Sequence, residues 1–197
     1  MSSDKLSDSN GHENGREAPW GRMSPVEHSV QIYATEAVFL DSLEGFVGGG
    51  LRTGESVIVF ATSEHRKALD DRLRARGVGL DDAQREDRYI ALDAQRTLDQ
   101  FMVKGWPDEV LFRNTVEPLI QRARLKSDKV RGFGEMVAVL WLQGFTGATV
   151  RLEHLWRQLC EREVFPVFCA YPSIGFAHDA NDSIIEICES HSRVMRG

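Results

Sequence analysis

The sequence predicts an α/β fold, a three-layer α-β-α sandwich with a mainly parallel central sheet, and three observations support it. Short apolar runs of strand-forming residues alternate along the chain with longer segments of helical periodicity. One of these runs, Ser56–Ala61, is apolar almost throughout, which is typical of a strand buried on both faces of a parallel sheet. Parallel strands joined through helices require crossovers, and these cover both faces of the sheet.

The first predicted strand is His28–Tyr33, where apolar and polar residues alternate. Thr35 can cap the helix that follows, in which Phe39 and Leu43 recur at helical spacing. We expect this helix to end at Gly48–Gly50, because glycine readily adopts the positive φ of a helix end.

The second strand, Ser56–Ala61, leads into a helix for which Ser63 is the expected N-cap and Gly77 the expected stop. Arg88–Leu92 is the third strand. A helix is predicted from Ala94 to about Lys104.

Pro107 fits the first turn of another helix, which Pro118 should kink or split. Lys129–Phe133 is a weaker strand. The remaining elements are apolar helical segments over 136–142 and 150–159, a strand over 165–171 and a terminal helix over 184–195.

Composition narrows the function. The chain has 197 residues and a formal net charge of -6, and an acidic domain repels nucleic-acid phosphates, so direct nucleic-acid binding is not expected. No apolar run approaches the ~20 residues that span a bilayer, which argues against a membrane partner and for a cytoplasmic protein. The three cysteines lie outside any C-x-x-C pattern, and no cofactor is expected.

Residues 1–26 are polar and without periodicity, which predicts a disordered N-terminal tail before a domain that spans residues 27–196. Trp20 and Met23 are the large apolar side chains of this tail. The tail could dock through Trp20, but we favour a solvated tail.

Polar residues follow four of the predicted strands, and in a parallel sheet the carboxyl ends of the strands form the usual ligand-binding edge. We therefore propose a ligand-binding rim of seven residues: Thr62, Ser63, His65, Arg66, Asp93, Glu135 and Tyr171. The simpler alternative is that strand ends are polar because they are loops. Ser63 and Asp93 would then be ordinary helix caps, and Glu135 a first-turn acid.

The order of elements around Ser56–Ala61 is that of a phosphate-binding P-loop core, but the loop itself is degenerate. The turn reads Ala61-Thr-Ser-Glu-His-Arg-Lys-Ala68, without the glycines that wrap a phosphate and without a Ser or Thr after Lys67 for magnesium. ATP hydrolysis is therefore not expected, and no catalytic residue is assigned. The alternative is a residual nucleotide-binding protein or enzyme that uses Asp93 and Glu135.

Several residues with reactive side chains form no clear catalytic or metal-binding pattern in the sequence. Cys169 lies in a predicted strand and is expected to be packing, although a redox role stays open. Glu153 could pair with an arginine. His154 is expected on a polar face, and His178 and His191 show no metal-ligand spacing, so no metal site is predicted.

Together these residues resemble a known family. The chain contains His28-Ser-Val-Gln-Ile-Tyr33, Gly50-Leu-x-x-Gly54-Glu55, Ala61-Thr-x-x-His65-Arg66, Leu92-Asp93-Ala94, Phe133-Gly134-Glu135-Met136-Val137, Leu152-Glu153-x-x-Trp156, Cys169-Ala-Tyr171 and Ile187-Cys188-x-x-His191-Ser192. Their order and spacing are similar to the MEDS domain, the sensory domain of methanogens and methylotrophs first described in a dichloromethane-response regulator.

The resemblance implies a fold related to the circadian-clock and recombinase ATPases (KaiC and RecA), with a degenerate phosphate loop. It also implies sensing of small molecules such as hydrocarbon derivatives, or a role in signal transduction and transcription regulation. Such domains are often attached to a histidine kinase or a DNA-binding module. We expect no such attached module here, so the domain is predicted to signal through a separate signalling protein. Oligomerisation is also compatible with the resemblance.

Overall fold

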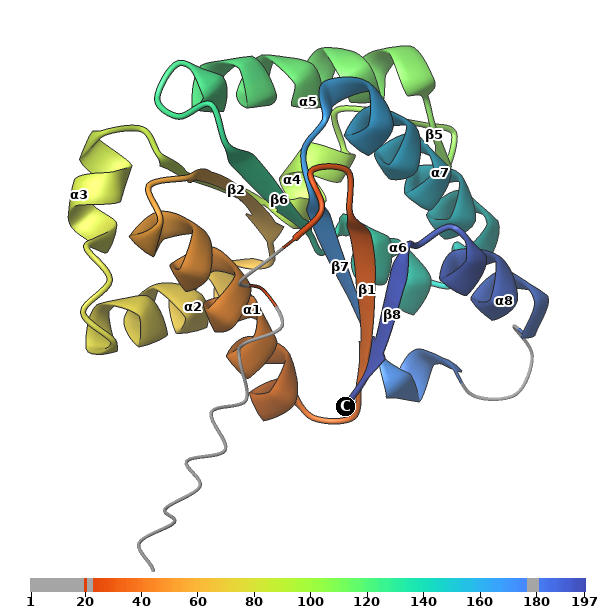
Figure 1. Cartoon of the computed structure of the whole chain (residues 1–197). Coiled ribbons are helices and arrows are strands. Elements are labelled where there is room, and N and C mark those ends of the chain that lie inside the picture. Colours follow the sequence, from red (N-terminus) through yellow and green to blue (C-terminus); the bar gives the residue numbers. More distant parts are fainter. Residues whose placement is uncertain (1–19, 21–22, 177–180) are drawn as a thin grey trace, which may run out of the picture.

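The computed structural model describes Trp20, residues 23–176 and residues 181–197, and contains a six-stranded parallel sheet between two layers of helices (Figure 1). The strands lie in the order β3-β2-β6-β7-β1-β8, and every pair in the sheet is parallel. Their bounds are β1 (His28–Tyr33), β2 (Ser56–Ala61), β3 (Tyr89–Asp93), β6 (Val130–Gly134), β7 (Val167–Pro172) and β8 (Arg193–Arg196). The predicted three-layer α/β architecture is confirmed.

The helices divide into two groups, one on each face of the sheet (Figure 1). The first group contains α1 (Glu36–Arg52), α2 (Ser63–Ala75) and α3 (Leu80–Arg85). The second group contains α4 (Ala94–Leu98), α5 (Glu109–Arg124), α6 (Met136–Leu142), α7 (Thr146–Glu163) and α8 (Asn181–Glu189). A short 3-10 turn, Ser173–Phe176, follows β7.

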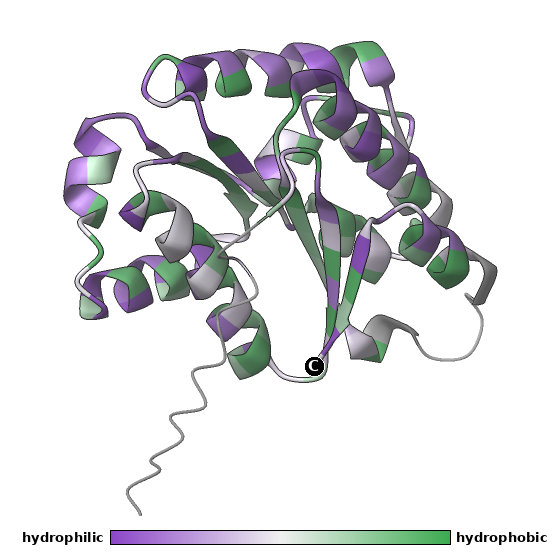
Figure 2. Cartoon of the chain, viewed as in Figure 1, coloured by the Kyte–Doolittle hydropathy of each residue, from purple (hydrophilic) through white to green (hydrophobic). Residues whose placement is uncertain are grey.

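The sheet separates two hydrophobic cores because successive side chains of a strand point to opposite faces. Along β2, Val57 and Val59 pack with α1, α2 and α3, whereas Ile58 and Phe60 pack with the second group of helices. The hydropathy colouring shows the same arrangement, with apolar strands inside and polar residues on the outer surfaces of the helices (Figure 2). β2 is buried on both faces, as its apolar run predicts.

Helix α1 begins as predicted, because the Thr35 side chain accepts a hydrogen bond from the Val38 amide. The predicted end at Gly48–Gly50 was wrong: the helix runs through these glycines to Arg52, and Gly54 with φ +79° follows it. The reason is packing. A Cβ atom on Gly50 would lie 2.7 Å from Nε of Arg131, a buried side chain that pairs with Glu55.

The predicted helix Ala94–Lys104 was also wrong, because α4 ends at Leu98. A hairpin of β4 (Met102–Val103) and β5 (Trp106–Pro107) follows. Lys104 and Gly105 form its two-residue turn with φ of 51° and 80°, the positive values that a type I′ turn requires.

Pro107 lies in β5 and not in a helix, so that prediction was wrong, and Asp108 caps α5 with a bond from the Leu111 amide. Pro118 does not split α5, which is one continuous helix.

The predicted terminal helix over 184–195 was wrong in its second half. α8 ends at Glu189, and β8 adds a sixth strand beside β1. The His191 ring nitrogen Nδ1 lies 2.6 Å from the carbonyl oxygen of Ile187. A side-chain donor bonded to a carbonyl in the last turn terminates the helix and frees the following residues to pair with β1.

Trp20 is 3% exposed, and its ring lies 4.7 Å from Phe168 and 5.2 Å from Phe46 between ring centroids. The expectation of a solvated side chain at this position was therefore wrong. The rest of the predicted disordered tail before Met23 lies outside the described residues. No helix in the described part of the chain is long and apolar enough to cross a bilayer.

Candidate functional site

The connections between strands diverge at the carboxyl ends of β2 and β6, the position at which open parallel sheets form a ligand-binding crevice. These strands are neighbours, but α2 follows β2 onto one face of the sheet and α6 follows β6 onto the other (Figure 1). In open parallel sheets, ligands bind where the connections diverge in this way, outside the carboxyl ends of the strands. The residues after β2 and β6 are Thr62 and Glu135, two members of the predicted rim.

Glu135 connects the ends of β2 and β6 with the first turn of α2. Its backbone amide donates to the Phe60 carbonyl at 2.8 Å, which fixes the residue against the end of β2. One carboxylate oxygen, Oε2, accepts from the Thr62 amide at 2.9 Å. The other, Oε1, lies 2.6 Å from Nδ1 of His65. Because a carboxylate can only accept, His65 Nδ1 carries the proton.

His65 lies between two carboxylates and an aromatic ring. Its Nε2 atom is 3.9 Å from Glu36 on α1, and its ring meets the Phe39 ring edge-on with centroids 4.9 Å apart. Tyr33, at the end of β1, stacks on Phe39. Burial raises the pKa of the Tyr33 hydroxyl to about 12, and the charges of Glu135 and Glu36 add to the shift.

Two further rim residues form a separate pair. Arg66 NH2 lies 3.2 Å from Asp93 Oδ2, and Asp93 also caps α4 through the Arg96 amide at 3.0 Å. The cap of α2 is Thr62 and not the predicted Ser63, because the Thr62 hydroxyl accepts from the His65 amide. Ser63 is exposed on the first turn of α2.

Tyr171 lies elsewhere than predicted. It is fully buried, and its hydroxyl donates to Oε1 of Glu153 on α7. The structure thus brings Thr62, His65 and Glu135 together, pairs Arg66 of α2 with Asp93, and groups Tyr171 with Glu153.

Around Glu153 lie His28, Cys169 and His191, which the sequence analysis did not place in a common site. They are distant in the sequence and meet only through the order of the strands. Glu153 pairs with histidines, so the expected arginine partner was wrong. His154, as expected, lies on a partly exposed face, near Glu186, and His178 lies outside the described residues.

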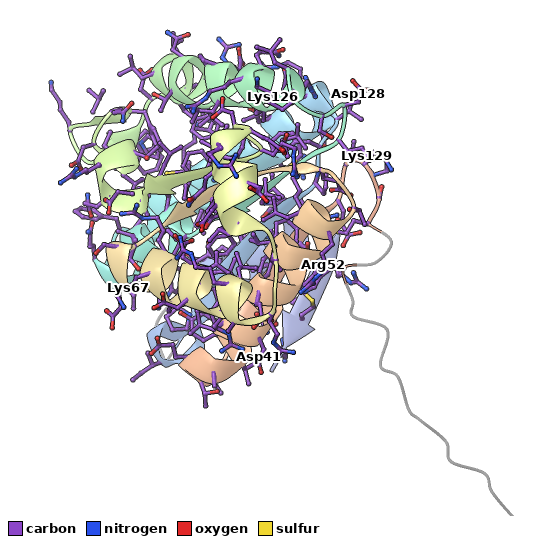
Figure 3. All side chains as sticks on the ribbon, turned by 90° about the vertical axis from the view of Figure 1, so that its left-hand side faces the viewer. Asp41, Arg52, Lys67, Lys126, Asp128 and Lys129 are labelled. Atoms are coloured by element: carbon purple, nitrogen blue, oxygen red, sulfur yellow. The ribbon has the colours of Figure 1, made fainter. Side chains whose placement is uncertain are left out.

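The geometry of α2 disfavours a bound phosphate. A helix N-terminus attracts anions through its free amides, but the Thr62 amide is already bonded to the Glu135 carboxylate. Lys67 is 82% exposed, pairs with Asp71 and points away from the body of the protein (Figure 3). With Glu36 and Glu64 beside His65, four acids (Glu36, Glu64, Asp93 and Glu135) surround the two bases His65 and Arg66, and this charge favours cationic or neutral ligands with hydrogen-bond donors.

The pairing of His65 with Glu135 predicts a pH-dependent contribution to stability. Burial lowers the pKa of His65, but the hydrogen bond and charge of Glu135, with the charges of Glu36 and Glu64, outweigh it and raise the pKa above its ordinary value. A group with a raised folded-state pKa stabilises the protein below its unfolded pKa of about 6.5, and this stabilisation disappears as pH rises through the folded value.

His65→Gln should therefore lower the free energy of unfolding more at about pH 6 than at about pH 9. Urea denaturation at the two pH values measures the difference. In a Glu135→Gln background the same substitution should show little pH dependence. An equal effect of His65→Gln at both pH values would contradict the assigned pair.

Comparison with known proteins gives one finding on the family. The family model described as MEDS, MEthanogen/methylotroph, DcmR Sensory domain, matches residues 27–192. No curated protein matches the chain.

Proposed function

Because the chain belongs to the MEDS family of sensory domains, we propose that it senses a small organic molecule and is not an enzyme. The ligand site is the crevice between β2 and β6. The ligand is neutral or cationic and donates hydrogen bonds, and the response passes to a partner signalling protein. The observation that carries the proposal is the Glu135 carboxylate on the Thr62 amide, in the place where a phosphate-binding protein would hold its phosphate.

The chemistry of the crevice supports a ligand of this class. Glu135, Glu36 and Asp93 supply acceptors, while Phe39 and Tyr33 supply apolar surface beside them. Alcohols, amines and other simple hydrocarbon derivatives combine a small apolar part with a donor. Asp93 and Glu135 are each held by a basic partner, which weakens the alternative that they act as catalytic acid and base. The layout of β2 and α2 also supports descent from a phosphate-loop fold such as that of the circadian-clock and recombinase ATPases.

Helix α6 offers a route for the signal. Glu135 is the residue before α6, and the other end of this helix leads to Leu142 and Phe145, which are exposed. Trp106 of the hairpin is also exposed. The hairpin turn at Gly105 lies against the Phe145 ring, and the start of α7 at Gly147 lies against the Trp106 ring. A ligand that separates Glu135 from His65 would shift α6, and a partner bound to this apolar surface would detect the shift.

A thermal-shift screen tests the proposal with methylammonium, methanol, dichloromethane, acetate, inorganic phosphate and magnesium-ATP. At 100 times its Kd a ligand stabilises the folded state by about 2.7 kcal/mol. For a chain of this size that is a rise in Tm of ~5–10 °C. We expect the rise with a neutral or cationic compound, and its loss in Glu135→Gln.

Lys67→Gln is the matched control, since Lys67 lies on α2 but outside the crevice, and it should keep the rise. Stabilisation by phosphate or magnesium-ATP alone would contradict the proposal and favour a nucleotide-binding protein. A rise that survives in Glu135→Gln would place the ligand site elsewhere.

A further inference from the structure

Four potential metal ligands converge on one buried point on the α7 side of the sheet. They are His28 at the start of β1, Cys169 in β7, Glu153 in α7 and His191 after α8, and one ligand atom from each lies within 4.8 Å of the others. All four residues are buried. This cluster is distinct from the crevice at Glu135, and the proposed function makes no use of it.

Four of the six distances between the ligand atoms agree with a tetrahedral metal site. Oε2 of Glu153 lies 3.3 Å from Nε2 of His28 and 3.3 Å from Nε2 of His191. Sγ of Cys169 lies 3.6 Å from Nε2 of His28 and 3.5 Å from Oε2 of Glu153. Zinc bonds of about 2.05 Å to nitrogen or oxygen and 2.3 Å to sulfur give tetrahedral edges of about 3.35 Å and 3.55 Å.

The proton positions also favour a cation between these atoms. Nδ1 of His191 lies 2.6 Å from the Ile187 carbonyl, which can only accept, so Nδ1 carries a proton. In the neutral ring Nε2 then has a free electron pair, and this pair faces a carboxylate oxygen. Nε2 of His191 lies 3.3 Å from Oε2 of Glu153 without the geometry of a good hydrogen bond. Two electron pairs that face each other repel, unless a proton or a metal ion lies between them.

The surrounding contacts are those of a metal centre. The Ile187 carbonyl orients His191, and the Tyr171 hydroxyl donates to the second oxygen of Glu153. Such partners fix the orientation of ligands around a metal. The rings of His28 and His191 lie 3.9 Å apart between centroids, so both imidazoles stand beside the same carboxylate. A divalent ion with one carboxylate, one thiolate and two neutral imidazoles is electrically neutral, as a buried site requires.

We propose that His28, Glu153, Cys169 and His191 bind one divalent transition-metal ion, Zn²⁺, in a closed structural site. The mixed nitrogen, sulfur and oxygen donors suit zinc, and four protein ligands leave no open position for catalysis. On binding, the Cys169 thiol releases its proton to solvent and a Zn–S bond forms. The ion ties β1, β7, α7 and the segment after α8 together, and so holds β8 at the edge of the sheet.

The first test uses the unmodified chain, purified without a histidine tag from zinc-supplemented medium. Elemental analysis should find one zinc per chain. Removal of the metal with a chelator should lower Tm, and added Zn²⁺ should restore it. Co²⁺ added to the metal-free protein should give the visible absorption of tetrahedral cobalt and a thiolate charge-transfer band in the near ultraviolet.

Matched variants locate the site. Cys169→Ser should abolish the charge-transfer band, while Cys188→Ser, a half-buried thiol on α8, should keep it. If Cys169→Ser does not fold, the cobalt spectrum of the wild-type protein still tests the proposed site. A spectrum of octahedral cobalt without thiolate bands would overturn it. The proposal is also overturned if the protein holds no metal, binds neither Zn²⁺ nor Co²⁺ and keeps its Tm with chelator. The cluster would then be a buried ion pair of Glu153 with a protonated histidine.

Discussion

Replacing Trp156 with Ala is expected to lower the free energy of unfolding by about 3–5 kcal/mol, because it opens a large cavity in the core. The side chain is fully buried on α7, and its ring lies 5.2 Å from Phe112 and 5.7 Å from Phe60 between centroids. It also covers β6, since a Cβ atom on Gly134 would lie 3.4 Å from the indole. One substitution therefore removes contacts between α7, α5 and the sheet. Urea or guanidinium denaturation measures the loss.

Trp106→Ala is the matched control, because Trp106 is 52% exposed on the β4–β5 hairpin. Its removal should cost about 1 kcal/mol or less, as for surface substitutions. If the two tryptophan variants lost equal stability, the assignment of Trp156 to the centre of the core would be wrong.

Gly50→Ala is expected to destabilise the protein by about 1–3 kcal/mol, the usual effect of overpacking. In an exposed helix, alanine would gain about 1 kcal/mol over glycine. Here the added Cβ atom would lie 2.7 Å from Nε and 2.8 Å from Cδ of Arg131. Arg131 cannot move without loss of its contacts to Glu55 at 2.6 Å and the Phe46 carbonyl at 2.9 Å. Steric overlap should therefore outweigh helix propensity.

Gly49→Ala provides the comparison on the same helix. The nearest atom to its added Cβ would be Arg131 NH1 at 3.8 Å, an ordinary contact distance. This substitution should stabilise the protein by up to about 1 kcal/mol through helix propensity alone. Opposite signs for the two variants in a denaturation experiment are the expected result. Equal signs would show that Arg131 does not pack against Gly50.

The sequence predicted the sheet well because its central strands are buried on both faces. The run Ser56–Ala61 has no other plausible structure, whereas β8 is an edge strand whose residues are only partly covered. Periodicity alone therefore assigned Arg193 to Met195 to a helix. The hairpin was missed for a different reason. Its turn depends on positive φ at Lys104, which a lysine rarely adopts, and only Gly105 signalled it.

The candidate site was predictable in part. Parallel strands bring their carboxyl ends to one edge, so the proximity of Thr62, His65 and Glu135 follows from their positions after β2 and β6. The orientation of Tyr171 could not be predicted from its position after a strand, because its hydroxyl donates to the buried carboxylate of Glu153 on α7. The cluster of His28, Glu153, Cys169 and His191 draws on four elements whose order in space no local pattern encodes.

Glu135 occupies the N-terminus of α2, and we therefore propose that this edge of the sheet binds no phosphate. Backbone amide resonances of Thr62 to Arg66 in a ¹⁵N NMR titration with magnesium-ATP test it most directly. We expect no saturable change of these resonances in the wild type. Saturable shifts at the Thr62 and His65 amides would show that a triphosphate binds at the N-terminus of α2, and the proposed absence of phosphate binding would then be wrong.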